Sequence, residues 1–205
     1  MTPASPLIIH CPHCNKEVAQ PRIASGNTFG AVLWSDAKQE APMLTHYPDL
    51  IRCPHCEGLF LASTATKSKN QPTGYTSSAP YPPELTEENW LDALDMDVLM
   101  GSHERYGRIG AWHAANAARR GKTNPTFDFS ERAVHNLEML GELFSQEDSA
   151  NDLILRAEIA RELKRFDESL SILMGIHDEE LGSVVSQIQE RAQSHDSSLF
   201  ELKFD

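Results

Sequence analysis

The sequence lacks long apolar runs, and no stretch among its 205 residues approaches the ~18 consecutive apolar residues that a membrane-spanning helix needs. We therefore expect no membrane partner. The start of the chain, Met1–Leu7, carries no basic residue, so we expect no secretory leader and a cytoplasmic location. A hydrophobic content of 40% and a charged content of 23% predict a folded chain with room for one medium domain or two small ones.

Basic residues are also scarce. The chain has 18 Lys and Arg against 30 Asp and Glu, which gives a formal net charge of −12. The acidic excess lies in the second part of the chain, because residues 1–80 carry +1 and residues 81–205 carry −13. An acidic surface repels phosphate backbones, so we do not expect nucleic acid as a general partner, although a local basic patch stays open as an alternative.

Motifs of known catalytic chemistry are missing as well. His103-Glu104 begins like an HExxH motif, but no second histidine follows at the required spacing. The sequence contains no Gly-x-Ser-x-Gly, no Gly-x-x-x-x-Gly-Lys-Ser/Thr and no dinucleotide-binding glycine pattern. We therefore expect a protein that is not an enzyme.

All four cysteines occur in two identical tetrapeptides, Cys-Pro-His-Cys, at residues 11–14 and 53–56. Two residues between cysteines allow a tight turn to direct both sulfurs at one ion, and four thiolates suit a tetrahedral zinc ion. The 38 residues between the pairs exceed the compact spacing, but extra loop length costs little. Because four sulfurs leave no open coordination position, we expect one structural Zn²⁺. Its predicted ligands are Cys11, Cys14, Cys53 and Cys56.

Three other interpretations of these motifs stay open. Cys-Pro-His-Cys resembles the active site of thioredoxin-fold thiol-disulfide oxidoreductases, but that site needs a long helix after it, and Pro21 and Gly58 follow too closely. Two structural disulfides would need an oxidising compartment. His10, His13 or His55 could replace a cysteine as a ligand, although we expect them to face solvent in the turns.

An apolar strand, a Cys-Pro-x-Cys turn and another strand occur twice between residues 7 and 65, and this order resembles a zinc ribbon. The run 28–34 and a turn at 35–38 would enlarge its central hairpin. Residues 66–83 are rich in Thr, Ser and Pro, which predicts a linker. We therefore predict an α+β chain with a zinc-ribbon domain at 7–65, this linker, and a helical domain at 84–205.

Helical periodicity predicts six helices after the linker, and Thr86, Ser130 and Ser149 are suited to cap three of them. The segment 157–170 resembles the middle of a tetratricopeptide repeat (TPR), with Lys164 where the turn glycine is usual. Because one such unit cannot bury its own apolar face, the resemblance implies that neighbouring helices stack on it.

The whole layout resembles an uncharacterised bacterial family that joins a Cys-Pro-x-Cys ribbon to a TPR-like helical region. The likeness rests on residues 7–62 and 150–202, including the strings Gly-Asn-Thr-Phe and Arg-Phe-Asp-Glu-Ser-Leu. It implies a bacterial, cytoplasmic protein and no particular activity.

A local basic island interrupts the acidic part of the chain at residues 101–125. It predicts either a patch for an anion or an acidic partner, or internal neutralisation of the acidic segments on both sides. The basic residues are Arg105, Arg108, Arg119, Arg120 and Lys122.

Together these features predict a zinc-binding, non-enzymatic module for protein–protein interaction or scaffolding, with a protein partner of unknown identity. A nucleic-acid-associated regulator that uses the ribbon and the basic island is the first alternative. A Cys-Pro-His-Cys thiol-disulfide oxidoreductase is the second. The sequence predicts no oligomeric state.

Overall fold

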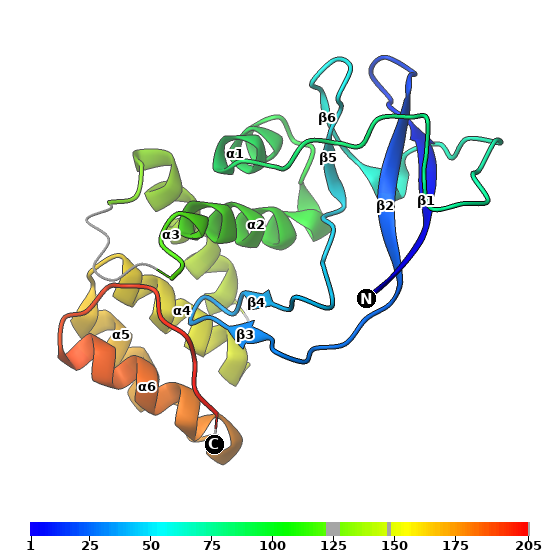
Figure 1. The fold of residues 1–205 in the computed structure, drawn as a ribbon. Helices are drawn as coiled ribbons and strands as arrows, with labels where there is room; N and C mark the ends of the chain where they lie inside the picture. The colour runs from blue at the N-terminus through cyan, green and yellow to red at the C-terminus, as the bar shows by residue number, and fades with distance from the viewer. Residues whose placement is uncertain (122–127, 147–148, 205) are drawn as a thin grey trace. The chain divides into compact units, whose positions relative to one another are not determined.

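The computed structural model describes residues 1–121, 128–146 and 149–204. It is an α+β structure, with two-stranded hairpins in the N-terminal part of the chain and helices in the C-terminal part (Figure 1). Within the described ranges, no helix is both long enough and apolar enough to cross a bilayer.

The chain forms two compact units. The first, which we call the cysteine unit, contains residues 1–31 and 40–100, and the second, the helical unit, contains residues 32–39 and 101–205. This division places residues 66–83 inside the cysteine unit and departs from the expected boundaries in two further ways. Residues 32–39 lie between the cysteine motifs in sequence but group with the helices, and α1 groups with the cysteine motifs.

Two antiparallel hairpins form the β part of the cysteine unit. Strand β1 (Thr2–His10) pairs with β2 (Glu17–Ser25), and β5 (Leu50–Arg52) pairs with β6 (Leu59–Leu61). Each hairpin is closed by one Cys-Pro-His-Cys turn. The predicted order of strand, cysteine turn and strand is therefore confirmed in both halves.

Alternation along β1 and β2 gives this hairpin two apolar faces. Ile9 and Val18 are fully buried in a core that includes Phe60 and two of the cysteines. On the other face, Ile8 packs with Ala79. The cysteine turns are therefore part of the apolar core of this unit.

Residues 66–83, expected to be a linker, run along both edges of the first hairpin. The carbonyl oxygen of Thr66 accepts a hydrogen bond from His10 N at 2.8 Å, on the β1 side. The carbonyl oxygen of Pro80 accepts one from Ala19 N at 3.0 Å, on the β2 side. The segment therefore satisfies backbone groups of the hairpin, a contribution that its polar composition alone does not indicate.

A short 3-10 helix, η1 (Ala62–Thr64), and one α-helix, α1 (Glu87–Asp95), complete the cysteine unit. Thr86 caps α1 as expected. Its side chain accepts from Asn89 N while the Asn89 side chain accepts from Thr86 N, which makes a reciprocal capping box. Trp90 is buried on this helix.

Five α-helices and two 3-10 helices are described in the helical unit, and consecutive α-helices pack against one another along the chain. Ser130 and Ser149 cap α3 and α4 through hydrogen bonds from Ala133 N and Asp152 N, which confirms both predicted caps. The elements are η2 (Gly101–His103), α2 (Glu104–Ala117), α3 (Glu131–Ser145), α4 (Ala150–Glu162), α5 (Phe166–Met174), η3 (Glu179–Leu181) and α6 (Gly182–Gln193).

Close packing of α4 and α5 relies on small residues. Ala157, Ala160 and Ser169 are buried, as the sequence predicts for positions of close helix approach. Lys164, in the turn between these helices, has φ 63°, which is the left-handed conformation that glycine adopts without steric cost. The lysine therefore occupies the backbone conformation for which glycine is usual.

A small β element belongs to the helical unit although its sequence lies between the cysteine motifs. Strand β3 (Val32–Leu33) pairs with β4 (Gln39–Glu40), whose last residue lies at the boundary between the units. The C-terminal segment continues this element, because Ser35 N donates to Phe200 O at 2.9 Å and Leu202 N donates to Leu33 O at 2.8 Å. The expected central hairpin exists, and its tip is part of the helical unit.

Candidate metal centre

The two cysteine turns have the same local structure. The carbonyl oxygen of Cys11 accepts from Asn15 N at 2.8 Å, and that of Cys53 accepts from Glu57 N at 2.9 Å. Asn15 and Glu57 both adopt the left-handed conformation, with φ 59° and 63°. In the second turn, His55 N points at Cys53 Sγ at 3.4 Å, so that an N–H dipole faces the sulfur. Identical tetrapeptides thus form equivalent turns.

The four sulfur atoms lie together, all within 4.8 Å of one another. Cys11 Sγ is 3.8 Å from Cys56 Sγ, and Cys14 Sγ is 3.8 Å from Cys53 Sγ. A tetrahedron with a metal–sulfur distance of about 2.3 Å has edges of about 3.8 Å. These sulfur–sulfur distances are also far longer than a disulfide bond of about 2.05 Å, and all four cysteines are free thiols.

The chemistry of the donor set fits a soft, tetrahedral ion such as zinc. All four donors are sulfur, so a four-coordinate ion would have a closed shell without a position for water or substrate. The ligands would be the predicted ones: Cys11, Cys14, Cys53 and Cys56. A bound ion would supply structure here, and the set offers no Lewis-acid site to a substrate.

Burial makes the site costly without a cation. It raises the pKa of Cys11 to about 12, against a smaller lowering by hydrogen bonds from the backbone N–H groups of Cys14 and His13. The more exposed Cys14 has its pKa lowered to about 7, mainly because Lys16 N–H donates to its sulfur. A divalent ion would offset the charge that burial penalises at Cys11 and would use the thiolate that is already favoured at Cys14.

Both histidines of the motifs connect one half of the site to the other. His13 Nε2 lies 3.0 Å from Leu59 O, on the strand that follows the second turn. His55 Nε2 lies 3.1 Å from Glu17 O, on the strand that follows the first turn. Within the described residues, neither ring is among the groups that converge on an ion. Both histidines are exposed, as expected, and the reciprocal hydrogen bonds of their rings are an addition that the sequence analysis did not foresee.

Gly58 makes room for one of these cross-links. A Cβ atom at this position would lie 2.5 Å from His13 Cδ2, well inside van der Waals contact. The corresponding residue of the first turn is Lys16, so the glycine is specific to the half in which the His13 ring crosses.

The arginines of the basic island are directed toward carboxylates. Arg105 forms an ion pair with Asp152, whose side chain is buried. Arg108 Nη2 lies 2.7 Å from Glu104 Oε1. Lys122 lies outside the described residues. These contacts favour internal neutralisation over an open anion patch.

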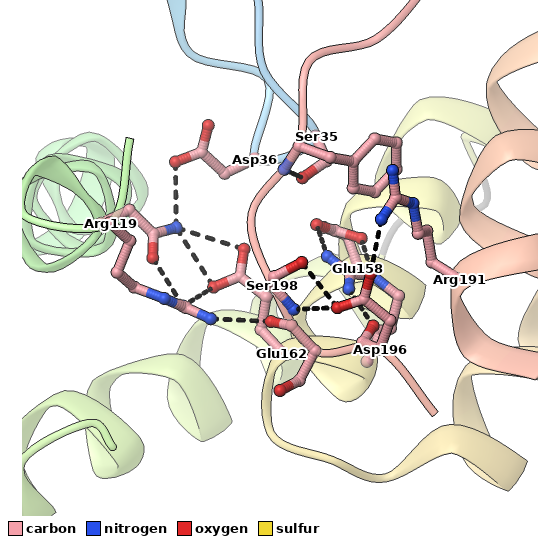
Figure 2. A network of polar contacts seen from close by, with 12 residues as sticks. Ser35, Asp36, Arg119, Glu158, Glu162, Arg191, Asp196 and Ser198 are labelled. Carbon is pink, nitrogen blue, oxygen red and sulfur yellow. Dashed lines mark hydrogen bonds and ion pairs between the residues drawn. The ribbon is translucent and has the colours of Figure 1, made fainter. Parts of the chain in front are cut away.

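The remaining two arginines, Arg119 and Arg120, also pair with buried carboxylates, and Figure 2 shows the part of this network around Arg119. Arg119 Nη1 lies 2.8 Å from Glu162 Oε2, and these side chains are 4% and 0% exposed. Arg120 Nη2 lies 2.7 Å from Asp36 Oδ2, and Asn116 Nδ2 donates to both carboxylates. The network therefore fixes the tip of the β3–β4 hairpin to α2 and α4.

Glu162 is fully buried in this network. Burial raises its pKa to about 7, Glu158 adds to the rise, and Arg119 opposes it. Sequence reasoning missed this residue and Asp36, because a buried acid and a solvated acid look alike in an acidic chain.

A second part of the network joins α4 to the C-terminal segment. Arg161 Nη2 lies 2.6 Å from Glu158 Oε1, and both side chains are 0% exposed. Arg161 also donates to Asp196 O and lies over the ring of Phe200, with Cζ 5.1 Å from the centroid. Because these groups are bonded to one another, the network serves as an internal cross-link of the helical unit.

Comparisons with known proteins identify no relative. No protein-family model, no curated protein and no solved structure matches the chain. The converging sulfurs are thus the feature on which a function can be built.

Proposed function

We propose that the chain is a zinc-binding protein in which one structural Zn²⁺ holds the cysteine unit together, and that the folded chain acts as a non-enzymatic interaction or scaffold module. The observation that carries the proposal is the meeting of four sulfurs from two separate turns within 4.8 Å. A closed set of four thiolates suits zinc and leaves no reactive position.

The geometry supports metal binding over thiol-disulfide exchange. In a redox Cys-x-x-Cys motif the first cysteine is an activated thiolate at the start of a helix. Here the first cysteine of the motif, Cys11, is buried with a raised pKa, and each turn is followed by a strand. Two motifs at one point also suit a shared ion better than a single redox pair.

The interaction role is supported by the architecture. A helical unit with consecutively packed helices accompanies the cysteine unit, and the TPR-like assignment of α4 and α5 would give such a unit a binding role. The alternative of a nucleic-acid regulator has less support, because the island arginines of the described chain pair with internal carboxylates. We propose a protein partner and a bacterial, cytoplasmic setting.

The metal part is tested by elemental analysis and thiol counting on purified, reduced protein. We expect about one zinc per chain, four thiols that resist a thiol reagent until a chelator is added, and tetrathiolate absorption after replacement by Co²⁺. A folded, metal-free protein with four reactive thiols would contradict the proposal.

The interaction part is tested with the zinc-loaded full chain as bait in native extract. We expect a partner in stoichiometric amount that is recovered again when it is tagged in the reverse experiment. Failure of every candidate in the reverse experiment would argue against an interaction role.

A further inference from the structure

The cysteine unit contains a concave site with an unusual lining. A cavity of about 610 Å³, within the common range for ligand sites, lies between β1, β2, residues 45–51 and residues 75–85. Six of the chain's twelve prolines line it, together with three of its four tyrosines. The rings come from separate parts of the sequence: Pro3, Pro6, Pro21, Pro48, Pro82, Pro83, Tyr47, Tyr75 and Tyr81.

The tyrosine rings at this cavity are open to solvent. Tyr47, Tyr75 and Tyr81 are 40%, 65% and 44% exposed, and the fourth tyrosine of the chain lies on α2. Exposed aromatic rings gathered at one concave site are characteristic of a binding surface, because each presents an apolar face and a hydroxyl that can donate or accept.

The cavity contains one arginine, Arg22, whose charge is not paired within the described residues. Arg22 is exposed, and within the described residues its side chain makes no hydrogen bond or ion pair. A neighbouring cavity of about 490 Å³ shares Arg22 and Tyr47 with the first, so the two adjoin along β2 and make a longer groove. Glu84, the acidic residue of the lining, belongs to the first cavity alone. The shared stretch of the groove therefore favours an acidic group in its ligand.

The prolines of the wall indicate how a ligand would be held. A proline has no backbone N–H, so these positions cannot donate to an added β-strand. Pyrrolidine and phenol rings instead form flat apolar surfaces on which a polyproline II helix, with three residues per turn and unpaired carbonyls, can lie. Tyrosine hydroxyls at such a surface donate to those carbonyls.

We propose that this groove binds an extended, proline-rich segment of a partner protein, with an acidic side chain of that segment paired to Arg22. The inference rests on the proposed function as an interaction module, and it names the surface and the chemical class of the partner. The pre-formed polyproline II conformation lowers the entropy lost on binding, which suits an open groove.

The test uses the zinc-loaded full chain and a fluorescent peptide of about ten residues made of proline and two glutamates. We expect saturable binding in fluorescence anisotropy, with amide and ring chemical-shift changes at the groove tyrosines in NMR spectra. A peptide with glycine in place of proline should bind at least about fivefold more weakly, and so should a peptide with lysine in place of glutamate.

Two variants locate the binding. Tyr75→Ala and Arg22→Glu should each raise the dissociation constant at least about fivefold. Their matched controls are Phe29→Ala, which removes an 86% exposed aromatic ring outside the groove, and Lys69→Glu, which reverses an exposed charge outside it; neither should change binding. Unchanged thiol protection in all four variants shows that the fold is kept.

Three results would overturn the inference: no binding of the proline peptide at about 1 mM, equal binding of the glycine peptide, or binding that neither groove variant weakens. Concentration-dependent dimerisation that Tyr75→Ala abolishes would also overturn it, since the occupant would then be a second copy. If the extract partner is still captured by the Tyr75→Ala/Arg22→Glu double variant, the groove inference fails while the proposed interaction function stands.

Discussion

The two units of this chain achieve stability by different means. The main apolar core of the cysteine unit contains Cys11 and Cys53 themselves. The helical unit has two apolar clusters, one around Trp112 and one around Ile188, and buried ion pairs that involve α2 and α4. A bound ion would offset the charge of thiolates buried in the first unit, whereas the charged groups buried in the second unit are paired with one another.

The units also differ in how their polar groups relate to sequence. In the cysteine unit the polar ligands occur in two short repeated strings. In the helical unit Asp36, Arg119 and Glu162 come from three distant segments that meet in the fold (Figure 2). A local motif can thus be recognised before folding, whereas the network has no counterpart in the sequence pattern.

Removing the metal should have the largest effect on stability, and it should act on the cysteine unit alone. Because structural zinc contributes on the order of 10 kcal/mol in small modules, a chelator should unfold the cysteine unit and leave the helices of the helical unit formed. The readout is loss of NMR dispersion for β1 and β2 with retained α-helical circular dichroism. Cys53→Ser should reproduce the effect, and loss of helical signal to the same extent would contradict the separate stabilisation of the two units.

Removing one charge of the buried pair should have the next largest effect. Arg161→Met leaves Glu158 buried without its partner and should lower the free energy of unfolding of the helical unit by about 3–5 kcal/mol. Glu158→Leu in the same chain should restore much of that loss. The control is Arg165→Met, which breaks an exposed pair with Glu138 and should cost less than about 1 kcal/mol.

Equal losses from Arg161→Met and Arg165→Met in chemical denaturation would show that the buried network is not what distinguishes the helical unit.

The raised pKa of Glu162 should make the helical unit sensitive to pH. In the folded chain the Glu162 carboxyl stays protonated up to about pH 7, whereas in the unfolded chain it loses its proton near pH 4.5. The contribution of Glu162 to the free energy of unfolding is therefore lost as pH rises through that window. The loss should reach at most about 3 kcal/mol. His113 acts in the opposite sense, because burial lowers its pKa and favours the fold as pH rises toward 6.5.

The measurement compares wild type with Glu162→Gln. The local stability of α4 is determined for both from amide hydrogen exchange between about pH 4.5 and 7. Relative to the variant, the wild type should weaken with rising pH. Glu138→Gln, which changes an exposed acid on α3, should show no such trend, and a trend of the reverse sign for Glu162→Gln would contradict the assignment.

The smallest expected effect concerns the histidine cross-links. His13→Ala and His55→Ala each remove one hydrogen bond between the halves and should weaken zinc binding about tenfold without releasing the ion at neutral pH. Gly58→Ala should resemble His13→Ala, because the new methyl group occupies the place of the ring. His135→Ala, an exposed histidine on α3, is the control in competition with a metal indicator.

If zinc affinity is unchanged in both His13→Ala and His55→Ala, these rings do not stabilise the metal site.

Much of the secondary structure could be predicted because its signals are local. Caps at Thr86, Ser130 and Ser149 depend on residues three positions apart, and the cysteine turns depend on four residues each. The segment 66–83 was harder, because its order comes from backbone hydrogen bonds to the β1–β2 hairpin, and composition carries no record of such bonds. Residues 32–39 were also hard to assign, because they lie between the cysteine motifs in sequence but pack with the helical unit.

The four sulfur donors can be identified from the sequence, because two identical tetrapeptides contain every cysteine of the chain. The spacing within each tetrapeptide favours a tight turn that points both sulfurs the same way. The partners of the charged side chains, in contrast, depend on the tertiary structure. The island arginines became internal partners of Asp36, Asp152 and Glu162 instead of a surface patch. The physical reason is range: a tight turn is settled by bonds within a few residues, whereas burial of an ion pair depends on which distant surfaces pack together and exclude water.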